Sequence, residues 1–173
     1  VAVNVSPVQI KSPGLVLNIV RILAETGLHA RRLELEMTET VLIQDDEATL
    51  VVLHNLRDLG IRIAMDDFGT GFSSLSYLHR FPFDKIKIDR CFIKNLPEDI
   101  GSVATTKAII GIAKARQIMT TAEGVETEEQ RKLLRKLGCD QIQGFLISAA
   151  KPASDIVVSM NSDGGRKALS RAG

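Results

Sequence analysis

Six short strand-like segments each end in a polar residue that could bind a metal ion or act on a phosphate. These residues are Asn4, Glu36, the pair Asp66 and Asp67, Lys87, Glu123 and Gln143. Successive members of the series lie 20 to 36 positions apart, and a β-strand with its crossover helix occupies roughly 30 residues. Residues of this chemical kind therefore recur once in each strand–helix unit.

Residue types alternate within these segments, which predicts two different strand faces. Successive side chains of a strand point to opposite sides of the sheet. In segments 33–37, 61–66 and 85–89 one face is apolar and the other carries the charged residues. In a parallel barrel the second face lines the interior, and the strand ends open into the mouth that holds the active site. Antiparallel strands with one solvated face would alternate in the same way, but the helical stretches between the segments argue against them.

The same alternation places three charged residues one layer below the strand ends. These are Glu34, Arg62 and Lys85. Oppositely charged side chains on one face of neighbouring strands can pair. We interpret the three as a structural charge network.

The bulk composition is that of one ordinary globular domain. The chain has 173 residues, of which 45% are apolar and 25% charged. A net charge of +1 gives no general affinity for DNA, RNA or anionic membranes.

Cys91 and Cys139 are isolated, which predicts free thiols and a cytoplasmic location. This chain contains no apolar run of about 18 residues, so we expect no membrane contact by it, although a longer parent protein could be membrane-anchored. The histidines lack metal-ligand spacing and are expected at the surface: His29, His54 and His79.

Helical patterns separate the strand-like segments. The expected helices cover 12–27, 45–59, 73–80, 100–116 and 127–137. Ser12 and Pro13 are interpreted as the N-cap and first turn of the first helix. Thr127 and Gln130 form a capping box at the start of the fifth. Repeated strand–helix–strand units imply right-handed parallel crossovers.

The number of strands predicts an incomplete α/β barrel. Six strands are expected, whereas a closed (β/α)8 barrel has eight, so about a quarter of the ring is expected to be absent on the N-terminal side. Residues 153–173 are interpreted as a C-terminal turn, near 156–160, followed by a disordered tail from 164. An open sheet leaves edges that can pair with another copy, so we expect a homodimer or oligomer.

The strand-end residues suit hard divalent cations, which prefer carboxylate and amide oxygens. Asn4, Glu36, Asp66 and Asp67 supply such oxygens from three strands, and Glu123 supplies one from a fourth. Neighbouring aspartates normally point to opposite sides of a strand, so both can reach one site only where the strand gives way to a loop. Aspartates that bridge two cations are the usual machinery for hydrolysing a phosphodiester.

Two further residues lie at the same level of the sheet. Lys87 could neutralise a phosphate or orient the attacking water, and Gln143 could hold that water or a substrate hydroxyl. Taken singly, each motif has a simpler interpretation: an Asp-Asp pair is commonly a solvated turn or a helix cap, and a lone lysine is commonly an ion-pair partner. The functional interpretation depends on all six segments agreeing on one end of one sheet.

Several long motifs resemble those of the EAL-domain family of cyclic-di-GMP phosphodiesterases, and the resemblance covers residues 1 to about 152. The motifs are residues 3–6 (VNVS), 33–40 (LELEMTET), 66–75 (DDFGTGFSSL), 85–89 (KIKID), 122–127 (AEGVET) and 143–145 (QGF). The resemblance implies a TIM-like barrel with one antiparallel strand. It also implies Mg²⁺ or Mn²⁺ in a two-metal site and hydrolysis of cyclic di-GMP to linear pGpG.

The resemblance also implies a role for each candidate residue. Asn4, Glu36 and Asp66 would bind one metal, and Asp66 would bridge to a second metal bound by Asp67 and Glu123. Lys87 matches the lysine that activates or positions the nucleophilic water. The remaining matches are Gln143, near that water; Glu39, which braces the loop 67–75; and Glu126, a supporting residue behind the ligands.

The sequence departs from the family pattern at its N-terminal side. The tripeptide that names the family, whose glutamate is a metal ligand, lies on an earlier strand and has no counterpart here. A degenerate module that binds cyclic di-GMP or a partner protein without catalysis is therefore an alternative, as is a purely structural fragment. For the 173-residue chain alone we expect weak or no activity. GGDEF or sensory domains are possible in the parent protein.

Overall fold

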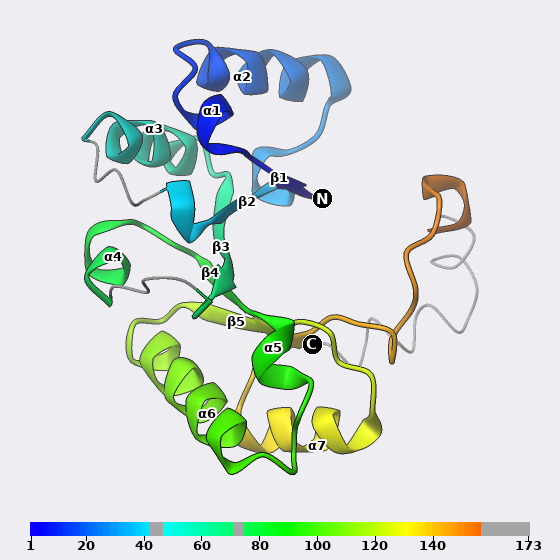
Figure 1. Ribbon diagram of the computed structural model, residues 1–173. Helices are drawn as coiled ribbons and strands as arrows, with labels where there is room; N and C mark the ends of the chain where they lie inside the picture. Colours follow the sequence, from blue (N-terminus) through cyan, green and yellow to red (C-terminus); the bar gives the residue numbers. More distant parts are fainter. Residues whose placement is uncertain (42–46, 71–74, 157–173) are drawn as a thin grey trace.

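The computed structural model describes residues 1–41, 47–70 and 75–156, and the elements are labelled in Figure 1. The strands are β1 (Ala2–Asn4), β2 (Glu34–Thr38), β3 (Arg62–Phe68), β4 (Lys85–Ile88), β5 (Met119–Ala122) and β6 (Gln141–Ile142). The α-helices are α1 (Pro7–Ile10), α2 (Leu15–Thr26), α3 (Glu47–Asp58), α4 (Leu75–Arg80), α5 (Arg90–Ile93), α6 (Ile100–Ala115) and α7 (Glu128–Leu137). Two 3₁₀ helices, η1 (Ala30–Arg32) and η2 (Glu39–Val41), flank β2.

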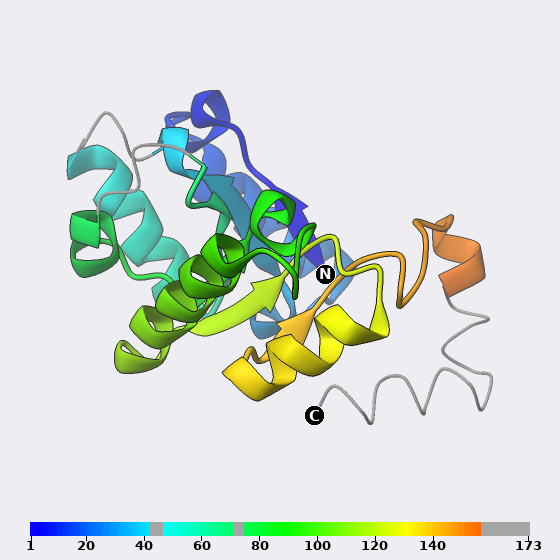
Figure 2. The same cartoon turned by 60° about the horizontal axis from the view of Figure 1, so that its bottom comes forward.

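All six strands belong to one parallel sheet in the order β1-β2-β3-β4-β5-β6. Strands that follow one another in the chain are therefore neighbours in the sheet. The sheet curves into part of a barrel, with the long helices α2, α3, α6 and α7 on its outer side (Figures 1 and 2). The predicted α/β architecture with six parallel strands of an open barrel is confirmed.

The two faces of the sheet differ as the alternation predicts. Under the helices the strands contribute a continuous apolar core: Leu35, Met37, Ile63, Met65, Ile86 and Ile88. On the inner face, Lys85 Nζ lies 2.7 Å from Glu34 Oε1, and Arg62 Nε lies 3.8 Å from Glu34 Oε2. Glu34 and Lys85 are buried. The predicted charge network is therefore present beneath the level of the strand ends.

The predicted start of the first helix is wrong. The chain forms the short helix α1 first, with Ser6 as N-cap and Pro7 in its first turn. Ser12 then lies in the turn that follows, where its carbonyl accepts the amide of Leu15. The N-cap of α2 is Gly14, without a side-chain cap. The Ser12–Pro13 pattern gave a wrong helix start because the backbone of Ser12 closes a turn between α1 and α2.

The other helix ends agree with the sequence patterns where they can be compared. Thr127 and Gln130 form the predicted capping box of α7, and Gly138 ends that helix in the left-handed conformation. The predicted helix starts at 45 and 73 lie outside the described residues. So do the predicted tail from 164 and most of the turn near 156–160.

Strand β1 forms one edge of the described sheet, because it pairs with β2 alone. Next to it lies an apolar groove of about 580 Å³ between the strands and α2. Its lining includes Val1, Val3, Ile22 and Leu28, of which the first three are exposed. Among the described helices, none is long and apolar enough to cross a membrane.

Candidate metal centre

The ammonium group of Lys87 lies at the centre of the site. Its Nζ atom is 2.8 Å from Glu36 Oε2, 3.0 Å from Asp66 Oδ1 and 2.8 Å from Glu123 Oε1. Glu36 lies in β2, Asp66 lies in β3 and Glu123 directly follows β5, whereas Lys87 lies in β4. Lys87 is only 5% exposed. Four of the predicted site residues therefore meet at the carboxyl end of the parallel sheet, where such folds place their sites.

The charges in this group shift one another's ionisation. Burial disfavours the ammonium form of Lys87, but its hydrogen bonds to Glu123, Glu36 and Asp66 outweigh burial and raise the pKa of Lys87. Burial also raises the pKa of Glu123, and the neighbouring carboxylates of Asp66 and Glu36 add to that effect while Lys87 opposes it. At Glu123 the favourable effect of Lys87 is therefore smaller than the opposing effects of burial and neighbouring charge.

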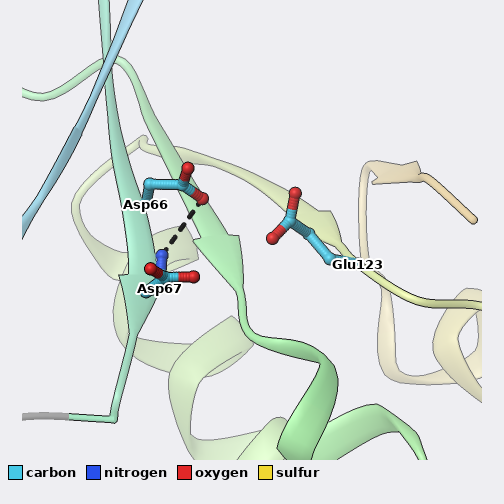
Figure 3. A group of neighbouring side chains, drawn as sticks. All are labelled: Asp66, Asp67 and Glu123. Atoms are coloured by element: carbon cyan, nitrogen blue, oxygen red, sulfur yellow. Dashed lines mark hydrogen bonds between the residues drawn. The ribbon is translucent and has the colours of Figure 1, made fainter. Parts of the chain in front are cut away.

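The two aspartates reach the same site because β3 changes conformation at its end. The register between β3 and β4 shifts between Met65 and Phe68, and Asp67 takes a positive φ of 52°. The Asp67 amide donates to Asp66 Oδ1 at 3.1 Å. Asp66, Asp67 and Glu123 each offer a carboxylate oxygen, and these oxygens lie within 4.8 Å of one another (Figure 3). Both aspartates therefore face one cluster.

Asp89 lies next to this cluster and was given no role by the sequence. Burial raises the pKa of Asp67, and repulsion by Asp66 and Asp89 raises it further. Asp89 is the N-cap of α5, and its Oδ1 accepts the amide of Cys91 at 2.8 Å. Burial works against ionisation of Asp89, but its hydrogen bonds, first of all those from Cys91, lower its pKa. Its position two residues after Lys87, on the same strand face, is the signal that could have identified it.

Glu39 contacts the start of the loop that follows β3. It is 7% exposed, and its Oε1 accepts the amide of Gly69 at 3.1 Å. The turn itself is closed by Thr70, whose amide and hydroxyl both donate to the carbonyl of Asp67. The contact with Glu39 is the one that a bracing residue would make, although residues 71–74 of that loop lie outside the described chain.

The remaining candidates lie at the borders of the cluster. Asn4 is aligned with Glu36 in the parallel register of β1 and β2, and it is exposed. Gln143 follows β6 and lines a pocket of about 350 Å³ with Glu126 and Phe145.

Known proteins resemble this chain along most of its length. A family model described as EAL domain matches residues 1–150. MucR of Pseudomonas aeruginosa, named a bifunctional diguanylate cyclase/cyclic di-GMP phosphodiesterase, is 41% identical over 92% of this chain and 23% of its own. The chain spans about a fifth of the length of the curated relatives it matches first.

Solved structures share the same fold. The EAL domain of Mycobacterium smegmatis DcpA is 41% identical with a TM-score of 0.87, and the match covers 91% of this chain and 70% of that one. Klebsiella pneumoniae BlrP1, solved as a manganese and cyclic-di-GMP complex, is 34% identical with a TM-score of 0.80 over 86% of this chain and 38% of that one. Sequence, fold and the match along nearly the whole chain give one conclusion: this chain belongs to the EAL domain family.

Proposed function

We propose that this chain forms the larger part of a metal-dependent phosphodiesterase domain that hydrolyses cyclic di-GMP to linear pGpG. One observation carries the proposal: carboxylates of Asp66, Asp67 and Glu123 lie within 4.8 Å of one another at the strand ends, beside the buried ammonium of Lys87. A MucR structure described as a cyclic-di-GMP complex, 42% identical over 90% of this chain, supports the choice of substrate.

The donor set fits hard cations. Asp66, Asp67 and Glu123 offer carboxylate oxygens close to one another, and such oxygens suit Mg²⁺ and Mn²⁺. We propose that Asn4, Glu36 and Asp66 bind one ion, and that Asp66 also contributes to a second site with Asp67 and Glu123. BlrP1 has been solved with manganese and with calcium, which supports a divalent site. When bound, such a pair of ions stabilises charge on phosphoryl oxygens and makes water more nucleophilic.

The residues of the chain itself would orient the reactants. Lys87 places a fixed positive charge among the carboxylates, where it can stabilise charge that develops on a phosphate or hold a water molecule. Gln143 lies on the neighbouring pocket and can hydrogen-bond that water or a substrate hydroxyl. Glu39 supports Asp67 through Gly69, and Glu126 supports the loop that carries Glu123.

A second candidate function is binding of cyclic di-GMP, or of a partner protein, without cleavage. The observation that favours it is the place of Asn4, which lies exposed on the edge strand β1. A metal-binding residue on an edge strand is held by one neighbouring strand, whereas one on an inner strand is held by two. Tight nucleotide binding without turnover in the parent protein would establish this alternative.

The test is incubation of the chain, and of a longer parent protein, with cyclic di-GMP and either Mg²⁺ or Mn²⁺, followed by chromatography for pGpG. We expect pGpG from the parent and a weaker or absent signal from the chain alone. Asp66→Asn in the parent should abolish the product, whereas Asp58→Asn, an exposed helix position, should not. Absence of pGpG from the unmodified parent would refute the proposal. Failure of the chain to bind Mn²⁺ would instead indicate a purely structural fragment.

We further propose that the chain self-associates through its β1 edge and the adjoining groove, and that the parent protein carries another signalling domain, such as a GGDEF or sensory domain. The exposed Val1 and Val3 beside an unpaired strand edge support the first part, and the two activities named for MucR support the second. A cytoplasmic site of action follows from the proposed substrate. A monomer in sedimentation velocity would contradict self-association.

A further inference from the structure

Helix α5 contacts two loops that adjoin candidate metal ligands. One loop follows β3, whose last residues include Asp67, and the other follows β5 and begins with Glu123. Helix α5 begins at Arg90, three residues after Lys87 of β4, and lies at the same end of the sheet as the three acidic side chains (Figures 1 and 3). Its first residues contact one loop on each side.

Phe92 makes the contact with the first loop. Gly69 has a φ of +97°, and a Cβ placed on it would lie 2.8 Å from Phe92 Cε2 and 3.0 Å from Cζ. The ring therefore packs directly against the glycine backbone. The Gly69 amide also donates to Glu39 Oε1 at 3.1 Å. Backbone that packs on an aromatic ring and is hydrogen-bonded to a carboxylate has little freedom to move, and Asp67 is only two residues away.

Arg90 makes the contact with the second loop. Gly124 has a φ of +66°, and a Cβ there would lie 2.4 Å from Arg90 Cγ. The guanidinium continues past the glycine to Glu126, with 2.8 Å between Arg90 Nη2 and Glu126 Oε1. The aliphatic part and the charged end of one side chain thus contact two positions of the loop that begins with Glu123.

We infer that α5 is a rigid bridge that sets the position of Asp67 relative to Glu123, with Phe92 and Arg90 as its positioning residues. The inference rests on the proposed function, because the spacing of these two carboxylates matters only if they share a metal site. Residues that orient metal ligands from behind typically change metal affinity by about 10- to 100-fold when mutated. Removing either contact of α5 should have an effect of that size.

The first test is titration of the chain with Mn²⁺, followed by electron paramagnetic resonance of the free ion. Phe92→Leu and Arg90→Ala should each weaken Mn²⁺ binding by about 10- to 100-fold. The matched controls are Phe81→Leu, which alters a buried aromatic side chain outside the bridge, and Arg21→Ala on the exposed face of α2. Phe81→Leu should lower the melting temperature without changing Mn²⁺ affinity. Unchanged affinity in both bridge variants would overturn the inference.

The second test does not depend on metal. Amide hydrogen exchange can follow Gly69, whose amide is bound by Glu39, and Val125, whose amide donates to the carbonyl of Gln143. If α5 joins the loops, Arg90→Ala should speed exchange at Gly69 as well as at Val125. An effect confined to Val125 would refute the bridge. A wild-type chain that binds no Mn²⁺ but shows the coupled exchange would indicate a purely structural fragment and leave the bridge in place.

Discussion

Replacing Lys87 with methionine tests the description of the charge cluster most directly. The change removes the ammonium group and keeps a side chain of similar length. Glu36, Asp66 and Glu123 each lose a contact of 2.8 to 3.0 Å. Three carboxylates then face one another without a positive charge between them. We expect the folded chain to lose stability at neutral pH.

The size of the loss follows from the burial of the group. The side chain of Lys87 is 6% exposed, and those of its partners are 11% to 18% exposed. Removing one partner of a buried ion pair costs about 3–5 kcal/mol. For a chain of this length such a loss lowers the melting temperature by about 6 to 20 °C.

The loss should depend on pH. Burial and the neighbouring carboxylates already raise the pKa of Glu123, and Lys87 opposes that shift, so without Lys87 the folded-state pKa of Glu123 should rise further above its unfolded value. Acids with a raised folded pKa destabilise the fold when they are ionised, and this penalty disappears as they take up protons. The destabilisation of Lys87→Met should therefore be largest at neutral and alkaline pH and shrink as the pH falls through the carboxylate range.

The assay is urea unfolding, followed by circular dichroism, with EDTA or with excess Mn²⁺. The matched control is Lys85→Met, which removes the partner of Glu34 one layer deeper. Both variants should be destabilised in EDTA, but Mn²⁺ should restore stability to Lys87→Met and not to Lys85→Met. Equal recovery of the two variants, or wild-type stability of Lys87→Met, would refute the reasoning.

Three further changes have defined outcomes. Glu39→Ala leaves the Gly69 amide without its acceptor and should cost about 1–3 kcal/mol in urea unfolding; no loss would contradict the bracing contact. Burial and Asp89 raise the pKa of Cys91 to about 11, so iodoacetamide labelling of its peptide at pH 8 should be about 100-fold slower than for an ordinary thiol and should rise with pH. Gly144→Ala puts a Cβ 2.3 Å from the Val125 carbonyl and should cost at least about 1–3 kcal/mol, with an unchanged melting temperature as the contradicting result.

The sheet and its two faces could be predicted because the signal is local. Alternating residues such as Glu34 and Glu36 must lie on one face of a strand, whatever the strand packs against. Their pairing with Lys85 and Lys87 then follows from the parallel order of the strands. The start of α2 could not be predicted in this way, because the turn at Ser12 depends on the preceding helix α1.

The parts of the site that the sequence did not reveal depend on contacts between distant segments. Arg90 and Glu126 are 36 positions apart in the chain, and no periodic pattern connects them. In the sequence Phe92 is an ordinary apolar residue, and only the structure shows that its ring packs on Gly69. The left-handed backbone at Asp67 is likewise set by the loop contacts of Gly69 and Thr70 rather than by a glycine at that position.

The ion pairs stacked along the inner face give the open half-barrel a hydrophilic lining. Glu34, Lys85 and Arg62 occupy the floor, and Glu36 and Lys87 lie above them. Apart from Arg62, these charged side chains are themselves buried, so they contact one another more than they contact water. The groove beside β1, in contrast, exposes apolar side chains, so replacing Val1 and Val3 with threonine should improve solubility.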